Sequence, residues 1–227
     1  MAGHGRGGRV GHRLALDHPR PVAVLAVLAV LAVLAVLDIV PTRHVFAHAH
    51  AAFAHAHAAF GPGYYHWFFL AAGNGIPERL IEGDPEYRIR ARMGARHHGG
   101  TAFDQAAQDE YVRCFSDPAA IHASCEDHRA AAGIDLVHDD AEAADGRRVT
   151  APLPALWGEH SFVGRSYDVP AVWREYAADV REQALPCDHY LPEEAPEATA
   201  EQCRTRSSRR GSTVRPGRPT GTDPPFV

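Results

Sequence analysis

The sequence predicts an α/β fold with a core of about three parallel strands and a helical insertion. Two short apolar segments, 151–158 and 183–187, end at a glycine turn and at a charged loop. A helical pattern over 169–180 separates them, and the long section 61–150 is mainly helical and rich in polar residues. Strands that alternate with helices are typical of a parallel sheet.

The N-terminal segment is rich in glycine, histidine and arginine, and then takes a helical pattern with Val10, Leu14 and Leu16 as apolar positions. Residues 22–37 are wholly apolar and repeat the triplet Ala-Val-Leu. A three-residue period fits neither a strand nor a helix, so this run is a low-complexity repeat first. We expect its end, near residues 33–40, to supply the first core strand. The remainder of the run could form a helix or an overlong strand with a bulged loop, and the sequence does not decide between them.

A second duplication follows, because the segment Ala-His-Ala-His-Ala-Ala-Phe occupies 47–53 and again 54–60. On a helix its four histidines would form two pairs that each share a face, and could chelate a metal: His48 with His55, and His50 with His57. Duplication alone explains this pattern. We therefore expect no metal site here.

The middle and C-terminal sections carry helix signals. Pro77, Pro85 and Pro118 mark helix starts or turns, and helices are predicted over 103–116 and 118–133. Pro192 and the acidic residues after it open a last helix. From residue 204 onward, arginines stand among Ser, Gly, Thr and Pro, which predicts a disordered basic tail.

The composition is that of a globular protein, with 45% hydrophobic and 22% charged residues. The net charge of −5 indicates no nucleic-acid partner. The four cysteines lack a C-x-x-C spacing, which favours reduced thiols over a disulfide framework or a zinc site. We expect no cofactor.

Residues 3–7, Gly-His-Gly-Arg-Gly, have the form of a nucleophile elbow, with Gly5 at its centre. Such a turn between strand and helix is sharp and needs small residues on both sides of the nucleophile. The helix N-terminus beneath it favours negative charge. A glycine-rich pentapeptide alone is weak evidence, and a flexible leader is the alternative.

Six segments, in the same order, make this chain resemble the haloacetate (fluoroacetate) dehalogenases, which have the α/β-hydrolase fold: 4–19, 37–42, 65–71, 125–130, 156–158 and 189–196. The resemblance runs from residue 3 to about residue 202, with the two repeats as insertions. It implies the C-terminal portion of a hydrolase, from the elbow onward. The implied domains are the core elbow, helix and strand over 1–40, a helical cap over 41–150, the rest of the core over 151–203, and the tail over 204–227.

The resemblance also implies a mechanism. A carboxylate attacks the carbon that bears the halogen, and a water activated by His, which an acid orients, hydrolyses the resulting ester. Two arginines hold the substrate carboxylate, and cap donors stabilise the departing halide. The resemblance implies Gly5 at the nucleophile position, His189 as the base and Asp38 as its acid. It implies Arg6 and Arg9 as the arginines that bind the substrate carboxylate. The implied halide ligands are His66, Trp67 and His128.

Three positions depart from the family pattern. Gly5 stands where the family has its nucleophilic Asp, so we expect an N-terminally truncated and inactive form of an enzyme that converts a haloacid to a hydroxy acid. His128 replaces a Tyr, and a His can still donate. Asp188 replaces a Gly, and we expect it to disturb the loop of His189. We also expect an open apolar edge at the strand near 33–40, and hence poor solubility.

An exported or membrane-anchored, His-rich binding protein is the alternative. Arginines precede the apolar run 22–37, as in a signal peptide, although 16 residues are short for a span of about 20. The enzyme interpretation implies a cytoplasmic protein with a small haloacid as partner, and no contact with a membrane. The pair Arg6 and Arg9 favours carboxylates over epoxides. A homodimer stays open.

Overall fold

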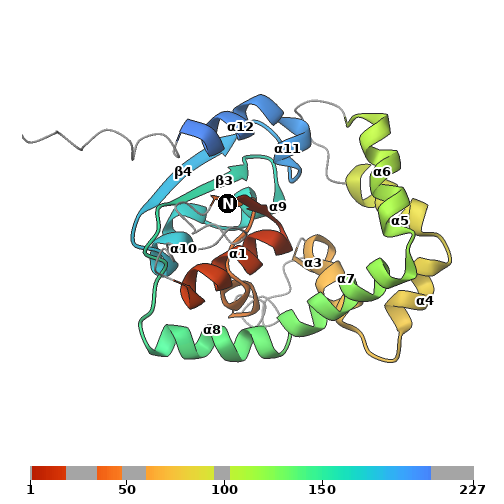
Figure 1. Ribbon diagram of the computed structural model, residues 1–227, viewed down its shortest axis with the longest axis horizontal. Coiled ribbons are helices and arrows are strands. Elements are labelled where there is room, and N and C mark those ends of the chain that lie inside the picture. Colours follow the sequence, from red (N-terminus) through yellow and green to blue (C-terminus); the bar gives the residue numbers. More distant parts are fainter. Residues whose placement is uncertain (1, 19–34, 48–59, 95–102, 206–227) are drawn as a thin grey trace, which may run out of the picture.

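A four-stranded parallel sheet forms the centre of the molecule (Figure 1). The computed structural model describes residues 2–18, 35–47, 60–94 and 103–205. The strands β1 (Ala2–His4), β2 (Ala35–Leu37), β3 (Leu153–Gly158) and β4 (Val180–Leu185) pair in that order. The register sets Gly3 beside Val36, Val36 beside Ala155, and Ala155 beside Glu182. The predicted α/β class is confirmed.

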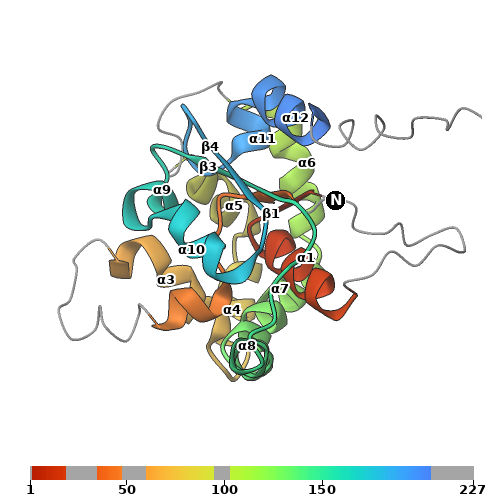
Figure 2. The same cartoon turned by 90° about the vertical axis from the view of Figure 1, so that its left-hand side faces the viewer.

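Helices cover both faces of the sheet. Neighbouring residues of a strand point to opposite faces, and here both faces carry apolar side chains that helices bury. Val36 and Ala155 belong to a core that includes side chains of α1 (Arg6–Asp17) and α10 (Val169–Tyr176). Leu37, Leu156 and Leu185 form a second core with residues of α11 (Leu191–Glu194) and α12 (Pro196–Thr205). Figures 1 and 2 show α11 and α12 on one side of the sheet and α1 and α10 on the other.

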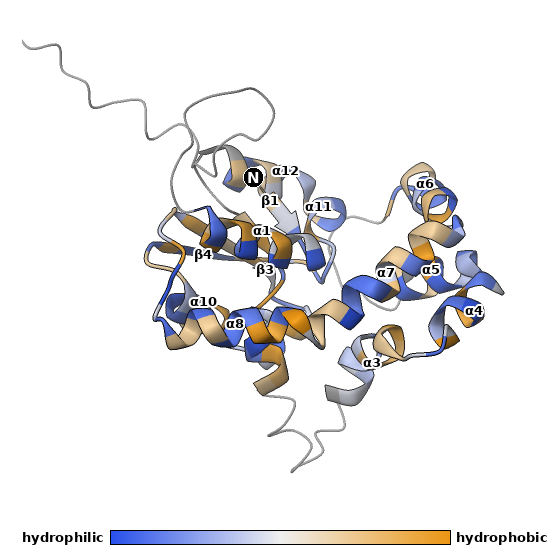
Figure 3. Cartoon of the chain, turned by 60° about the horizontal axis from the view of Figure 1, so that its bottom comes forward, coloured by the Kyte–Doolittle hydropathy of each residue, from blue (hydrophilic) through white to orange (hydrophobic). Residues whose placement is uncertain are grey.

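Between β2 and β3 the chain forms a separate helical layer. It comprises α3 (Phe60–Ala71), α4 (Ile76–Glu82), α5 (Pro85–Gly94), α6 (Gln105–Phe115), α7 (Pro118–Ala131) and α8 (Ile134–Ala144). The predicted proline signals lie at helix starts, with Pro77, Pro85 and Pro118 in the first turns of α4, α5 and α7. Asp104 and Asp117 cap α6 and α7 through their side chains. In Figure 3, α4, α5 and α6 extend away from the sheet, and α8 returns toward it.

The sheet differs from the prediction in two strands. The expected open edge near 33–40 is wrong, because β1 pairs with β2 along that edge and adds a strand to the three expected. The last strand, predicted over 183–187, begins at Val180. The helix predicted over 169–180 accordingly ends earlier, at Tyr176. The residues after it pair with the backbone of Val149, whose carbonyl accepts from the N–H of Ala178 (3.0 Å).

Several predictions fall outside the described residues. These are most of the Ala-Val-Leu run, the repeat histidines His48, His50, His55 and His57, and the tail from residue 206. The described helix α12 reaches Thr205, just past the predicted start of the tail. Within the described segments, no helix is long and apolar enough to span a bilayer.

Candidate active site

The predicted elbow is a sharp turn from β1 into α1. Gly5 lies between them with φ 56° and ψ −127°, a conformation that L side chains rarely adopt. A Cβ on Gly3 would lie 2.5 Å from the carbonyl oxygen of Gly7, so this strand and helix approach too closely for a larger residue. A Cβ on Gly5, by contrast, would meet nothing within 4 Å. Space at the centre of the elbow therefore admits a side chain.

Asp38 follows β2 and holds His189 across the sheet. Its Oδ2 accepts from Nδ1 of His189 at 2.7 Å, and its Oδ1 accepts from Ser161 Oγ (2.7 Å) and from the backbone N–H of Gly158 (3.1 Å). The carboxylate is 1% exposed. Asp38 also has a positive φ of 49°, rare for a residue other than glycine. These bonds fix the ring orientation of His189, as the predicted acid–base pair requires.

The loop of His189 is held on both sides, although Asp188 replaces the expected glycine. Glu194 accepts from the backbone N–H of Asp188 (Oε2, 3.0 Å) and of Tyr190 (Oε1, 2.9 Å). His4 Nε2 donates to the carbonyl of His189 at 2.7 Å. Because His189 still reaches Asp38, the expected disturbance by Asp188 is absent from this loop.

One cavity of about 290 Å³ lies at this end of the sheet. All of the predicted site residues line it, although they come from three helices (α1, α3 and α7), the elbow turn and two loops: Gly5, Arg6, Arg9, Asp38, His66, Trp67, His128 and His189. The structure thus brings together segments that lie far apart in the sequence. Their roles in a reaction stay predictions.

Known proteins share the fold of this chain. A protein from Nostoc sp PCC 7120, described as an α/β hydrolase, has 45% sequence identity and superimposes with a TM-score of 0.79 over 91% of this chain and 65% of its own. The chain has the α/β-hydrolase fold. A structure from Pseudomonas aeruginosa, described as an epoxide hydrolase, gives 37% identity and a TM-score of 0.77, over 92% of this chain and 65% of its own chain. No protein-family model matches.

The resemblance to the dehalogenases is also confirmed. A fluoroacetate dehalogenase from Burkholderia sp is 35% identical over 201 residues, which are 88% of this chain and 60% of the relative. The chain therefore spans about three fifths of that relative's length. A third similar structure, from Salmonella enterica, is described as an acyltransferase, with 39% identity and a TM-score of 0.78 over 92% of this chain and 63% of its own. The names of these relatives differ in activity, so the chemistry rests on the site.

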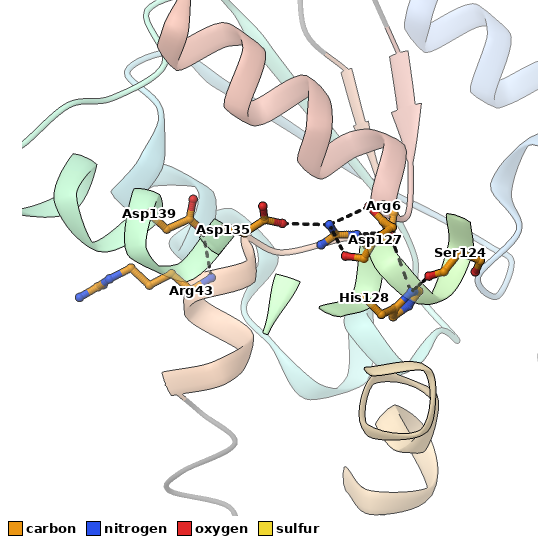
Figure 4. A network of polar contacts seen from close by, with 7 residues as sticks. All are labelled: Arg6, Arg43, Ser124, Asp127, His128, Asp135 and Asp139. Atoms are coloured by element: carbon orange, nitrogen blue, oxygen red, sulfur yellow. Dashed lines mark hydrogen bonds and ion pairs between the residues drawn. The ribbon is translucent and has the colours of Figure 1, made fainter. Parts of the chain in front are cut away.

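Two carboxylates of this chain bind Arg6. Its Nε donates to Asp127 Oδ2 (2.6 Å), and its Nη2 donates to Asp127 Oδ1 and Asp135 Oδ2 (2.9 Å each). Figure 4 shows the guanidinium between these side chains of α7 and α8. Burial lowers the pKa of Arg6, but the bonds to Asp127 and Asp135 raise it more. The charge of Arg6 is therefore largely balanced within the protein.

Arg9 is not balanced in this way. It makes no hydrogen bond or ion pair with any residue of the described segments, and its buried Nε has no acceptor there. Its guanidinium carbon lies 4.5 Å from the ring centroid of Trp67, a cation–π contact. Burial lowers the pKa of Arg9 to about 10, so it stays cationic at neutral pH. The cavity thus contains a positive charge that suits an anionic ligand.

The three predicted halide ligands lie together. The ring centroids of His66 and Trp67 are each 6.2 Å from that of His128. Nδ1 of His128 donates to the carbonyl of Ser124 (2.8 Å), so a neutral ring has no hydrogen on Nε2. Burial lowers the pKa of His128 and favours that neutral form. The expected donation from this His therefore requires its protonated state.

One cluster outside the cavity has metal-ligand residue types. Ligand atoms of Glu78, His122 and Glu126 lie within 4.8 Å of one another. However, Arg129 donates to Glu78 (2.7 Å) and to Glu126 (2.6 Å). Arg129 already occupies both carboxylates as a hydrogen-bond donor, so we assign no metal to this cluster.

The sequence did not reveal several residues that support the site. Ser161 and Glu194 hold the Asp38–His189 pair and its loop, and Asp135 binds Arg6. Asp127 lies inside the recognised Cys-Glu-Asp motif, which was the one available signal. Ser161 and Asp135 lie more than a hundred residues from the groups they bond, and no local pattern marks them.

Proposed function

We propose that this hydrolase binds a short halogenated carboxylic acid, as its fluoroacetate dehalogenase relative implies, and that the native chain does not complete the dehalogenation. The observation that carries the proposal is Arg9, a cation without a protein acceptor in the described segments, in the same cavity as the Asp38–His189 pair. A carboxylate ligand would supply both the missing acceptor and the balancing charge.

The full reaction has two steps. In the first, a carboxylate oxygen forms a bond to the carbon as the carbon–halogen bond breaks, and the halide leaves with the electron pair. In the second, a base removes a proton from water, the hydroxide attacks the ester carbonyl, and the hydroxy acid leaves as the carboxylate returns. His189 suits the base of the second step, because Asp38 orients its ring and stabilises the imidazolium.

The first step lacks its nucleophile here, because Gly5 has no side chain. Loss of a covalent nucleophile typically costs on the order of a millionfold in turnover. Arg9, Asp38 and His189, to which we assign carboxylate binding and water activation, nevertheless line one cavity. We therefore expect the native chain to bind a haloacid without consuming it.

Calorimetric titration with fluoroacetate tests this proposal. Arg9→Gln should weaken binding about 10- to 100-fold, since a charge-assisted hydrogen bond is worth about 1.5–3 kcal/mol. Arg13→Gln is the matched control, because Arg13 lies on the same helix but bonds Asp17 and Glu142 outside the cavity. Equal affinities for the native protein and Arg9→Gln would refute carboxylate binding at Arg9.

A further inference from the structure

A second cavity, of about 540 Å³, adjoins the site. The two cavities share a wall, since the same side chains line both: His4, Ile89, Arg92, Phe115 and Tyr190. Cavities of a few hundred Å³ are the size of sites for ligands much larger than a haloacetate. The combined space therefore exceeds the need of the short acid in the proposed function.

The walls of the second cavity are mainly apolar. The apolar side chains come from α5, α6, α7 and α11, with Met93, Ala120 and Pro192 added to the shared Ile89 and Phe115. Burial of hydrocarbon against such side chains is favourable, at about 0.8 kcal/mol per methylene. This cavity suits an uncharged hydrocarbon group.

Polar groups are placed differently in the two cavities. Arg9, Asp38 and His189 line only the first. In the second, the Tyr111 hydroxyl donates to Glu193, which joins α6 to α11 and satisfies both groups. His4 and Arg92 line both cavities at the shared wall. A ligand that fills both would therefore place an anionic end at Arg9, pass this wall, and place an apolar end against Met93, Ala120 and Pro192.

We propose that the second cavity binds the hydrocarbon tail of a longer 2-halo carboxylic acid, whose carboxylate lies at Arg9. This rests on the proposed function and names its substrate class. The reacting carbon would carry four different substituents: the carboxylate toward Arg9, the halogen toward His66 and Trp67, the tail toward Tyr190, and a hydrogen. Because these three directions are fixed by different parts of the cavity, the site should prefer one enantiomer.

Equilibrium titration of the native chain tests the inference, with fluoroacetate, 2-fluorobutanoate and 2-fluorohexanoate as probes. Full burial would tighten binding about fourfold per added methylene, and we expect at least about tenfold from the first acid to the last. One enantiomer of 2-fluorohexanoate should account for most of this gain. The gain should vanish in Ala120→Phe, whose ring would project into the second cavity and take the place of the tail.

Ala119→Phe is the matched control, because Ala119 is exposed, lies next to Ala120 on α7 and lines neither cavity. It should keep the full gain with tail length. If Ala120→Phe does not fold, alkylation of Cys114 replaces it: this exposed thiol lines only the second cavity, and 2-fluorohexanoate should slow its modification while fluoroacetate should not.

The outcomes separate the two proposals. Fluoroacetate binding that depends on Arg9, without any gain from the tail, overturns the inference and leaves the proposed function standing. A gain that survives in folded Ala120→Phe, or that is equal for both enantiomers, also overturns it. Absence of binding by every acid overturns both.

Discussion

Replacement of Glu194 should damage the loop of His189 more than any neighbouring substitution. The Glu194 carboxylate is 2% exposed and accepts from two backbone N–H groups, those of Asp188 (3.0 Å) and Tyr190 (2.9 Å). Glu194→Ala leaves both N–H donors without an acceptor, which lowers the free energy of unfolding by about 1–3 kcal/mol for each donor. Part of this loss is offset, because the variant no longer has to bury a carboxylate. We expect a net loss of about 2–4 kcal/mol, a large part of a typical domain's stability.

Urea denaturation followed by circular dichroism measures this loss. Glu194→Gln keeps one carbonyl acceptor for the two donors, so it should cost about half as much. Glu193→Ala is the matched control: Glu193 lies in the same helix and bonds the Tyr111 hydroxyl at the surface, so its loss should cost at most about 1 kcal/mol. If Glu194→Ala is no more destabilised than Glu193→Ala, the carboxylate does not hold the loop.

Three further predictions concern titration and hydrogen bonding. Burial lowers the pKa of His12 to about 4, below the unfolded value of about 6.5. The free energy of unfolding should therefore fall by up to ~3 kcal/mol as the pH drops from 6.5 to 4. In urea titrations, His12→Leu should remove this pH dependence. Chloride affinity should rise below pH 6.5 as His128 becomes protonated. A His128→Tyr variant should bind chloride independently of pH in this range. If the chloride affinity of the native chain does not change with pH, His128 is excluded as a ligand. Ser161→Ala loses the bond to Asp38 and the cap of α9 (Phe162–Ser166), and should cost about 2 kcal/mol of unfolding free energy; a cost below about 0.5 kcal/mol would show that neither bond matters.

Local patterns predicted the helices well. Pro77, Pro85 and Pro118 lie at the starts of α4, α5 and α7, and the glycines of the elbow meet a steric need visible at Gly3. Ordered matches to a known family placed Asp38 and His189 about 150 residues apart, and the structure joins them by a hydrogen bond. Motif order thus captured what the spacing of residues alone could not.

The strands were harder to predict. β1 has only three residues, too few for a period, and it forms because β2 offers a parallel partner. β4 lies at the sheet edge and contains Arg181, Glu182 and Gln183, so an apolar run marks only its end. Both elements are defined by pairing with a neighbour rather than by their own sequence.

Electrostatic balance could not be inferred from the sequence either. Arg6 and Arg9 were expected to act alike, yet Asp127 and Asp135 neutralise Arg6 from helices more than a hundred residues away. Arg9, one turn along the same helix, has no such partner in the described segments. Only the packing of α7 and α8 against α1 distinguishes the two arginines.

Fluoride release by Gly5→Asp, compared with Gly5→Asn, tests most directly whether the site lacks only its nucleophile. The two side chains have the same shape, fit the open space at residue 5 and tolerate a positive φ better than most, so backbone strain cancels between them. Only Asp supplies a nucleophilic carboxylate. We predict fluoride release from fluoroacetate by Gly5→Asp and none by Gly5→Asn or the native chain. A folded Gly5→Asp that binds fluoroacetate but releases no fluoride would contradict the account.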